Sequence, residues 1–263
     1  MKKNIVGYQG VPGAFSHKVL KNNFENSEEI SFLSFEEVFE AVKLGRIDYG
    51  IIPVENSNTG EINDVLDLLK YYNCYIEKTY ILKIDQNLLG LKGSNVSNIK
   101  EVFSHPQGFL QSKVYLKDKG WKETPFYNTA ISAKHVHENN NPEYAAIGSI
   151  ETASLYNLDI LEEKINDNDH NFTKFIIISN KLSNTGGKYS LLFSLSHEVG
   201  SLSKIILTIS KHNFNMLNIK SRPNKIEPWQ YYFYIEIEGC ELSEEIIKEL
   251  LANSIEFKIL GRY

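Results

Sequence analysis

The feature that most constrains the fold of this chain is the alternation of short β-branched runs with amphipathic stretches, which continues as far as Asn180. Alternation of this kind is typical of an α/β fold, in which helices join parallel strands and ligands bind beyond the carboxyl ends of the strands. We predict strands at residues 4–8, 30–33, 49–54, 75–84, 101–104, 144–148 and 174–179, and helices at 34–45, 61–72 and 107–120.

The pattern changes after the turn-rich stretch SNTGGK at residues 183–188. The elements that follow have the order βαββαβ, which is the order of ferredoxin-like domains. We therefore place a domain boundary between Asn180 and Lys188. The predicted elements are strand 189–196, helix 201–212, strand 215–221, strand 230–238, helix 243–253 and strand 256–260.

Composition narrows the possible partners of the protein. At 263 residues and 42% hydrophobic content, the chain can bury a sizeable core and is long enough for two domains. The formal net charge of -5 argues against a nucleic acid or an anionic membrane as a partner. Two cysteines are too few for a thiolate metal site, and no apolar stretch fits a membrane span or a secretory leader. We expect a cytoplasmic protein without a metal.

Glycines at positions 7, 10 and 13 follow the first predicted strand, in GYQGVPGAFS. Their spacing differs from that of a dinucleotide-binding loop, and Pro12 removes a backbone donor. Two interpretations remain open. Either the loop and the helix after it hold a small carboxylate, or the glycines only supply the dihedral angles of a tight turn.

Polar side chains follow two other predicted strands and precede a third. IIPVENSNTG at 51–60 has four polar residues in a row, more than helix capping alone requires, although a cap at Ser57 or Asn58 stays open. FSHPQGFLQS at 103–112 places Gln107 and Gln111 on one helix face, after a histidine whose role is open between structure and function. HNFTKFIII at 170–178 sets a hydroxyl beside a lysine at the start of a buried strand. Without a phosphate loop or a nucleophile elbow, we expect chemistry that needs no cofactor.

Together these motifs resemble the prephenate dehydratase family, with the regulatory ACT domain attached to its monofunctional members. The resemblance covers essentially the whole chain and is carried by the order and spacing of several segments: GYQGVPGAFS, IIPVENSNTG, SHPQGFLQS, YNTAISAKHV (127–136), AAIGSIETASLYNLDIL (145–161), NDNDHNFTKF (166–175) and HEVGSLSKIILTISKHNFNMLNIKSRP (197–223).

The resemblance implies a bilobed catalytic domain of the type II periplasmic-binding-protein kind at residues 1–182. Its first subdomain would comprise residues 1–77 and 158–182 and its second residues 78–157, with the ACT domain at 188–263. The implied reaction converts prephenate to phenylpyruvate, carbon dioxide and water, with phenylalanine as an allosteric effector. A homodimer or homotetramer is expected. No helical segment precedes the first strand, so we expect no fused chorismate mutase.

The resemblance also implies roles for individual residues. Thr173 matches the family's essential threonine and would donate a hydrogen bond to the leaving oxygen. Glu55 would either supply the proton, if burial raises its pKa, or only orient its neighbours. The implied catalytic residues are Thr173, Glu55, Asn56, Ser104 and Gln111. Substrate contacts are implied for Ser57, Thr59, Gly60, His105, Thr129, Asn171, Lys174 and Phe175, and effector contacts for Gly200, Ser201, Leu202, Asn218, Ser221, Arg222 and Pro223.

This sequence departs from the family pattern at three positions. Lys174 stands where an arginine is usual, which keeps the charge but loses the bidentate fork. In the predicted regulatory domain, Ser201 replaces an alanine and Lys220 replaces a glutamate. Two other functions stay open: arogenate dehydratase, which performs the same chemistry on the amino analogue, and a non-catalytic sensor of small carboxylates.

Overall fold

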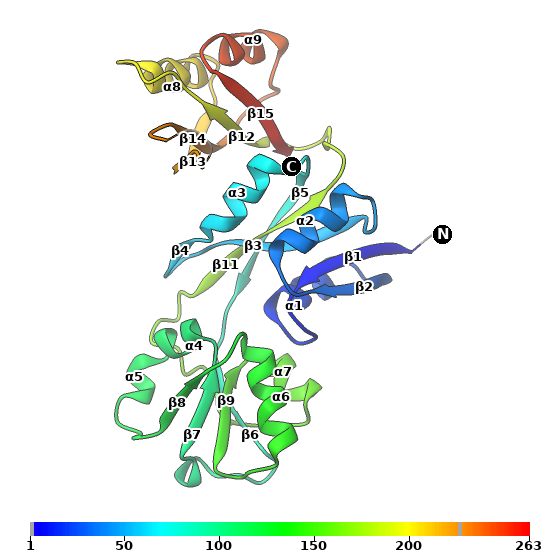
Figure 1. Cartoon of the computed structure of the whole chain (residues 1–263), viewed down its shortest axis with the longest axis vertical. Helices are drawn as coiled ribbons and strands as arrows, with labels where there is room; N and C mark the ends of the chain where they lie inside the picture. Colours follow the sequence, from blue (N-terminus) through cyan, green and yellow to red (C-terminus); the bar gives the residue numbers. More distant parts are fainter. Residues whose placement is uncertain (1–2, 226–227) are drawn as a thin grey trace. The chain divides into compact units, whose positions relative to one another are not determined.

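The computed structural model describes residues 3–225 and 228–263 of the chain (Figure 1). The chain divides into two compact units. Unit 1 comprises residues 1–38, 51–62 and 80–175, and unit 2 comprises residues 39–50, 63–79 and 176–263. These units cut across the predicted domains, and the boundaries at residues 77, 157 and 182 stay predictions.

The first strands of the chain carry polar residues at their ends. They lie in the order β11-β3-β1-β2 within a ten-stranded sheet, with β4 paired to β3. The predicted strands here are confirmed, and β4 is an addition that the sequence interpretation missed. The elements are β1 (Asn4–Gln9), α1 (Phe15–Asn23), β2 (Ser27–Phe32), α2 (Phe35–Lys43), β3 (Tyr49–Asn56), β4 (Gly60–Glu61) and β11 (Phe172–Ser179). Parts of α2, β3 and β11 belong to unit 2.

A second sheet lies wholly within unit 1, in the order β10-β6-β9-β7-β8. β7 runs parallel to β8 and β9, whereas β6 runs antiparallel to β9 and β10. The expectation of purely parallel sheets is therefore wrong. The strands are β6 (Asn87–Gly90), β7 (Glu101–Ser104), β8 (Lys122–Pro125), β9 (Tyr144–Gly148) and β10 (Asp159–Glu162).

Helices cover both faces of this second sheet (Figure 1). Alternate residues along a strand point to opposite faces, so Val102 packs with Phe109 of α4, whereas Phe103 packs with Ala133 of α6. The helix predicted at 107–120 is broken at Ser112, where φ is −122°. The helical elements are η1 (Val96–Asn98), α4 (Pro106–Gln111), α5 (Lys113–Leu116), α6 (Thr129–Asn139) and α7 (Ile150–Leu155).

Unit 2 contains α3 and the predicted βαββαβ segment, whose element order is confirmed. Its strand order is β13-β14-β12-β15-β5-β11, and the first four strands pair antiparallel around a core of their own. The elements are α3 (Asn63–Tyr71), β5 (Tyr75–Lys83), β12 (Lys188–Ser194), α8 (Ser201–Lys211), β13 (Asn215–Pro223), β14 (Tyr231–Glu238), α9 (Glu244–Ala252) and β15 (Glu256–Arg262).

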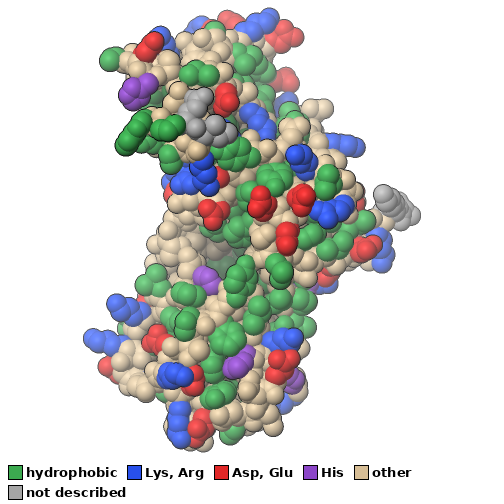
Figure 2. All heavy atoms as spheres, in the orientation of Figure 1, with side chains coloured by type: hydrophobic (Ala, Val, Ile, Leu, Met, Phe, Trp, Pro, Cys, Tyr) green, Lys and Arg blue, Asp and Glu red, His purple; other side chains and the backbone are tan. Residues whose placement is uncertain are grey.

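The surface carries charged side chains of both signs, interspersed over the face drawn in Figure 2. Within the described part of the chain, no helix is both long enough and apolar enough to span a membrane. Met1 and Lys2, which belong to the N-terminal stretch predicted not to be a leader, lie outside the described residues.

Candidate active site

The loop after β3 is shaped by the side chain of Asn56, which is only 6% exposed. Its Oδ1 atom accepts hydrogen bonds from the amides of Asn58 (3.0 Å) and Thr59 (3.2 Å). The amide of Ser57 donates instead to the carbonyl of Phe172. These three amides are already bonded, and α3 begins only at Asn63. These bonds favour a role of the three amides in shaping the loop, and substrate contacts of Ser57, Thr59 and Gly60 stay predictions.

The other end of the Asn56 amide reaches the start of β11. Its Nδ2 atom has two hydrogens, which are shared among three acceptors: Asn171 Oδ1 (2.9 Å), the Phe172 carbonyl (3.1 Å) and Thr173 Oγ1 (3.0 Å). A hydroxyl has one hydrogen to donate and two lone pairs. Because Thr173 Oγ1 accepts from Asn56, the hydroxyl hydrogen remains available to donate to another acceptor.

The side chain of Asn171 connects Asn56 to the segment after β5. It is 1% exposed, and its Nδ2 atom donates to the carbonyl of Ile84 at 3.3 Å. The amide of Ile84 donates back to the carbonyl of Asn171 at 2.8 Å. The segment before Thr173 is therefore fixed to the segment that leads out of β5.

The second polar cluster lies at the start of α4. Ser104 is fully buried, and its Oγ atom donates to the carbonyl of Ile147 at 3.4 Å. A Cβ at Gly108 would lie 2.2 Å from that Oγ atom, so the glycine makes room for the serine. This burial makes Ser104 a support for α4 in the structure, and its predicted catalytic role stays a prediction.

His105 caps α4, because its Nδ1 atom accepts from the amide of Gln107 at 3.2 Å. Burial lowers the pKa of His105, which favours the neutral ring that such a cap requires. Gln107 Nε2 then donates to Thr59 Oγ1 at 3.3 Å. That bond joins α4 to the loop after β3, so two clusters far apart in sequence meet in space.

Gln111, four residues after Gln107, lies on the same face of α4. Its Oε1 atom accepts from Gln86 Nε2 at 3.0 Å, and both side chains are buried. Gln86 is the residue that the sequence interpretation missed. The available signal was a run of polar residues, Asp85 to Asn87, between two apolar strands.

The glycine loop after β1 supplies a turn and a contact. Gly10 and Gly13 have φ angles of 109° and 90°, which other residues rarely adopt. The Gly13 amide donates to His17 Nδ1, and its carbonyl accepts from Thr152 Oγ1 at 2.9 Å. Of the two open interpretations, these contacts favour the tight turn.

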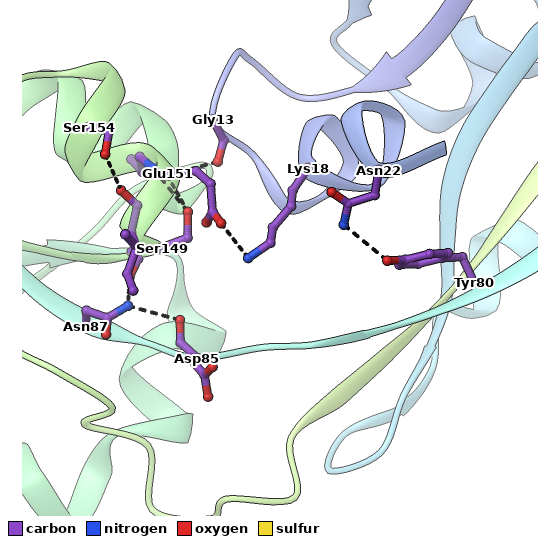
Figure 3. A network of polar contacts seen from close by, with 12 residues as sticks. Gly13, Lys18, Asn22, Tyr80, Asp85, Asn87, Ser149, Glu151 and Ser154 are labelled. Carbon is purple, nitrogen blue, oxygen red and sulfur yellow. Dashed lines mark hydrogen bonds and ion pairs between the residues drawn. The ribbon is translucent and has the colours of Figure 1, made fainter. Parts of the chain in front are cut away.

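Figure 3 shows the surroundings of that contact. Lys18 of α1 lies 2.6 Å from Glu151 of α7, in the same network as the Gly13 carbonyl. Asn22 donates to the Tyr80 hydroxyl at 3.1 Å. Helix α1 is therefore joined both to α7 and to β5 within unit 1.

The remaining predicted catalytic and substrate-binding residues lie around these clusters. Glu55 pairs with Glu61 across β3 and β4, and Thr129 is the first residue of α6. Lys174 is half-buried on β11, whereas Phe175 is 1% exposed and lies in the core. The structure thus brings residues 55–59, 104–111 and 171–173 together by direct hydrogen bonds.

Two predicted effector residues lie at a groove of about 390 Å³ in unit 2. Ser201 and Leu202 line it together with Tyr231 and Phe233. Arg222 has another partner: its guanidinium donates to both carboxylate oxygens of Asp67, at 3.2 and 3.0 Å. Gly200 caps α8 with a φ angle of 86°, and Asn218, Ser221 and Pro223 lie on β13.

One group of possible metal ligands is found among residues 3–225 and 228–263. His212, Glu245 and Glu249 have ligand atoms within 4.8 Å of one another. Lys211 Nζ lies 2.6 Å from Glu249, so a cation already balances part of the charge. The group is remote in sequence from the polar clusters of unit 1, and we assign it no role.

Comparison with known proteins identifies relatives over nearly the whole chain. A family model described as prephenate dehydratase matches residues 6–183. The bifunctional chorismate mutase/prephenate dehydratase of Escherichia coli (strain K12) is 32% identical over 270 residues, which cover 98% of this chain and 70% of the relative.

Two solved structures share the fold. Prephenate dehydratase from Arthrobacter aurescens, in complex with L-Phe, superposes with a TM-score of 0.88 at 24% identity, covering 98% of this chain and 90% of the other. GqqA, a novel type of quorum quenching acylase, superposes with a TM-score of 0.87 at 25% identity, covering 98% of this chain and 96% of its own.

Proposed function

The chain belongs to the prephenate dehydratase family, and we propose that it converts prephenate to phenylpyruvate, carbon dioxide and water in phenylalanine biosynthesis. The observation that carries the proposal is the 3.0 Å hydrogen bond from Asn56 Nδ2 to Thr173 Oγ1. It orients the threonine hydroxyl as a donor, which the departure of the substrate's hydroxyl requires.

The reaction breaks two bonds of the substrate ring, one to the hydroxyl and one to the carboxylate. The electron pair of the ring–carboxylate bond enters the ring, which becomes aromatic, and carbon dioxide is released. The hydroxyl leaves with its own electron pair and takes up a proton to become water. The protein therefore has to hold the substrate in place and stabilise charge on the leaving oxygen.

Each of these needs has a candidate group. The Thr173 hydroxyl donates to the leaving oxygen, and the adjacent Lys174 supplies a positive charge for a substrate carboxylate. Gln111 offers a side-chain amide on the α4 face that bonds to Thr59 through Gln107. Glu55 precedes Asn56 on β3 and is our candidate for the proton source.

A bilobed cleft of the type II periplasmic-binding-protein kind would bring these groups onto the substrate. Two segments that join the sheets of unit 1 support this part of the proposal. The amide of Ile165 donates to the carbonyl of Gln86 at 2.8 Å, and Asn166 Nδ2 donates to the carbonyl of Ile84 at 3.1 Å. Two such segments, bonded to each other where they pass between the sheets, are suitable hinges.

Regulation by phenylalanine through an ACT domain at residues 188–263 is a further part of the proposal. The βαββαβ order and the groove beside Ser201 support it, as does the L-Phe complex of the Arthrobacter aurescens relative. ACT domains bind effectors where two copies meet, so we expect a homodimer or homotetramer. A cytoplasmic location remains our expectation.

The test is an assay of the purified protein with prephenate, following the appearance of phenylpyruvate. Arogenate, tested side by side, distinguishes the dehydratase that acts on the amino analogue. An acylated signalling compound, included because of the likeness to GqqA, tests the acylase alternative. No phenylpyruvate from prephenate would refute the proposed function.

Thr173→Ala separates an enzyme from a sensor. We expect turnover to fall about a hundred- to a thousandfold, the usual loss for one donor to a developing charge, while phenylpyruvate binding measured by calorimetry is retained. Thr185→Ala, in the exposed linker, is the matched control. Full turnover in Thr173→Ala would contradict the assigned role.

A further inference from the structure

Gln86 is a buried side chain to which the proposed chemistry assigns no role. It lies in the short segment between β5 and β6 and is 3% exposed. The backbone amide of Gln86 donates to Asn166 Oδ1 at 2.7 Å, and its backbone carbonyl accepts from the backbone amide of Ile165 at 2.8 Å. The backbone of Gln86 is therefore held on both sides by the second connecting segment.

The side chain of Gln86 contacts Gln111, the last residue of α4. Gln86 Nε2 donates to Gln111 Oε1 at 3.0 Å. The backbone carbonyl of Gln111 accepts from the amide of Asp167 at 2.8 Å. Both members of the pair are thus attached to residues 165–167, which makes their contact a built feature of unit 1.

The direction of this hydrogen bond decides which end of Gln111 faces a ligand. A primary amide has one acceptor oxygen and two donor hydrogens. Since Gln86 occupies the Gln111 oxygen, the Gln111 NH₂ group points away from Gln86. Across the described residues, this NH₂ group makes no hydrogen bond, and it is not among their buried atoms without a partner.

The reverse arrangement is less favourable. In the structure, the Gln86 Oε1 atom is buried without a partner. If both amides turned over, a buried NH₂ group of Gln86 would be left unpaired instead. Orphaned donors are rarer in proteins than under-satisfied carbonyls, so the observed direction is the one that burial selects.

We propose that Gln86 is a positioning residue, which fixes the amide of Gln111 so that its NH₂ group donates to an oxygen of the substrate. This inference rests on the proposed function, since it assumes that an anionic substrate lies against Gln111. An ionised carboxylate accepts from an NH₂ group but cannot donate to a carbonyl, so for a substrate carboxylate the orientation of Gln111 determines whether the contact is attractive or repulsive.

Gln86→Glu tests the direction of the bond through pH. The introduced side chain only accepts while it is an ionised carboxylate, so Gln111 must turn and present its carbonyl to the substrate. Once protonated, the introduced carboxyl group donates again. We expect kcat/KM of this variant to fall by about ten- to a hundredfold at high pH and to recover as the pH is lowered, relative to wild type. Asn184→Asp, which introduces the same charge at an exposed amide in the linker, is the control.

Gln86→Leu, Gln111→Leu and the double variant test whether Gln86 acts through Gln111. Positioning predicts that the double variant is no worse than Gln111→Leu alone, because the lost contact is shared. Gln86→His has a ring N–H in place of the amide donor, so it should keep much of the kcat/KM that Gln86→Leu loses. Additive losses, or an unchanged pH profile in Gln86→Glu, would overturn the inference.

Phenylpyruvate binding by calorimetry provides a readout that needs no turnover. The Leu variants should weaken it in the same non-additive way. A wild-type protein that binds phenylpyruvate but does not turn over prephenate would refute the proposed function alone. Wild-type turnover with intact binding in Gln86→Leu would refute the role of Gln86 alone. Thermal unfolding of each variant shows whether it is folded.

Discussion

At the scale of single residues, Asn56 illustrates how one side chain organises a site. Its oxygen shapes the loop after β3 and its NH₂ group holds Thr173. An aspartate at this position would keep the first set of bonds and lose the second, because a carboxylate only accepts. The site therefore needs an amide, not merely a polar residue of this size.

Lys174 is the residue at which this chain departs most clearly from the family pattern. A lysine offers a point charge, whereas an arginine offers two parallel donors to a carboxylate. We expect Lys174→Arg to keep KM for prephenate or to lower it by about two- to tenfold. Steady-state kinetics beside Lys181→Arg, at an exposed position, provide the check. A large rise in KM would show that the resemblance misleads at this position.

At the scale of elements, α3 is held by side chains of the βαββαβ segment within unit 2. It begins two residues after β4, the strand that pairs with Glu55 and Asn56. Asp67 in the middle of α3 accepts hydrogen bonds from Arg222 of β13 and Tyr232 of β14. Asp67 therefore attaches α3 to two strands of this segment.

Asp67→Asn tests the strength of this link. Burial raises the pKa of Asp67, but hydrogen bonds from Arg222, Lys225 and Tyr232 outweigh it and lower the pKa to about 2. A lowered pKa means that the stabilisation is complete above the unfolded value of 3.8 and is lost as the pH falls through about 2. We expect the variant to be about 2 kcal/mol less stable at neutral pH.

Urea unfolding at pH 7 and at pH 2 to 4 measures this difference. The gap between wild type and Asp67→Asn should narrow as the solution becomes more acidic. Asp64→Asn, on the exposed side of the same helix, should change the free energy of unfolding by less than about 0.5 kcal/mol. A gap that does not depend on pH would show that the ionised carboxylate is not what stabilises the contact.

At the scale of the whole molecule, the proposal joins catalysis to feedback by the end product of the pathway. The groove beside Ser201 is lined by Tyr231 and Phe233, whose rings suit an aromatic amino acid. The substituted positions Ser201 and Lys220 do not remove these rings.

We expect L-phenylalanine to bind and to inhibit phenylpyruvate formation. Calorimetry measures the binding, and the prephenate assay with and without L-phenylalanine measures the inhibition. D-phenylalanine is the matched control, because the same groups in mirror-image arrangement fit the groove poorly. No heat of binding at millimolar L-phenylalanine would mean that the substitutions at Ser201 and Lys220 have disabled the site.

The sequence by itself determined the strands of unit 1 that end in polar residues and the βαββαβ order of unit 2, because hydrophobic periodicity is a local property. The same local patterns identified the segments of Asn56, Gln111 and Thr173. The sequence did not predict the antiparallel strands β6 and β10, because strand direction depends on pairing with distant residues.

Only the tertiary structure decided what these side chains do to one another. It showed that Ser104 is buried beneath Gly108 and that the amides after Asn56 are already bonded. It also brought Gln86 against Gln111, 25 residues further along the chain. The direction of a hydrogen bond depends on which donors and acceptors meet in space, and spacing along a chain does not carry that information.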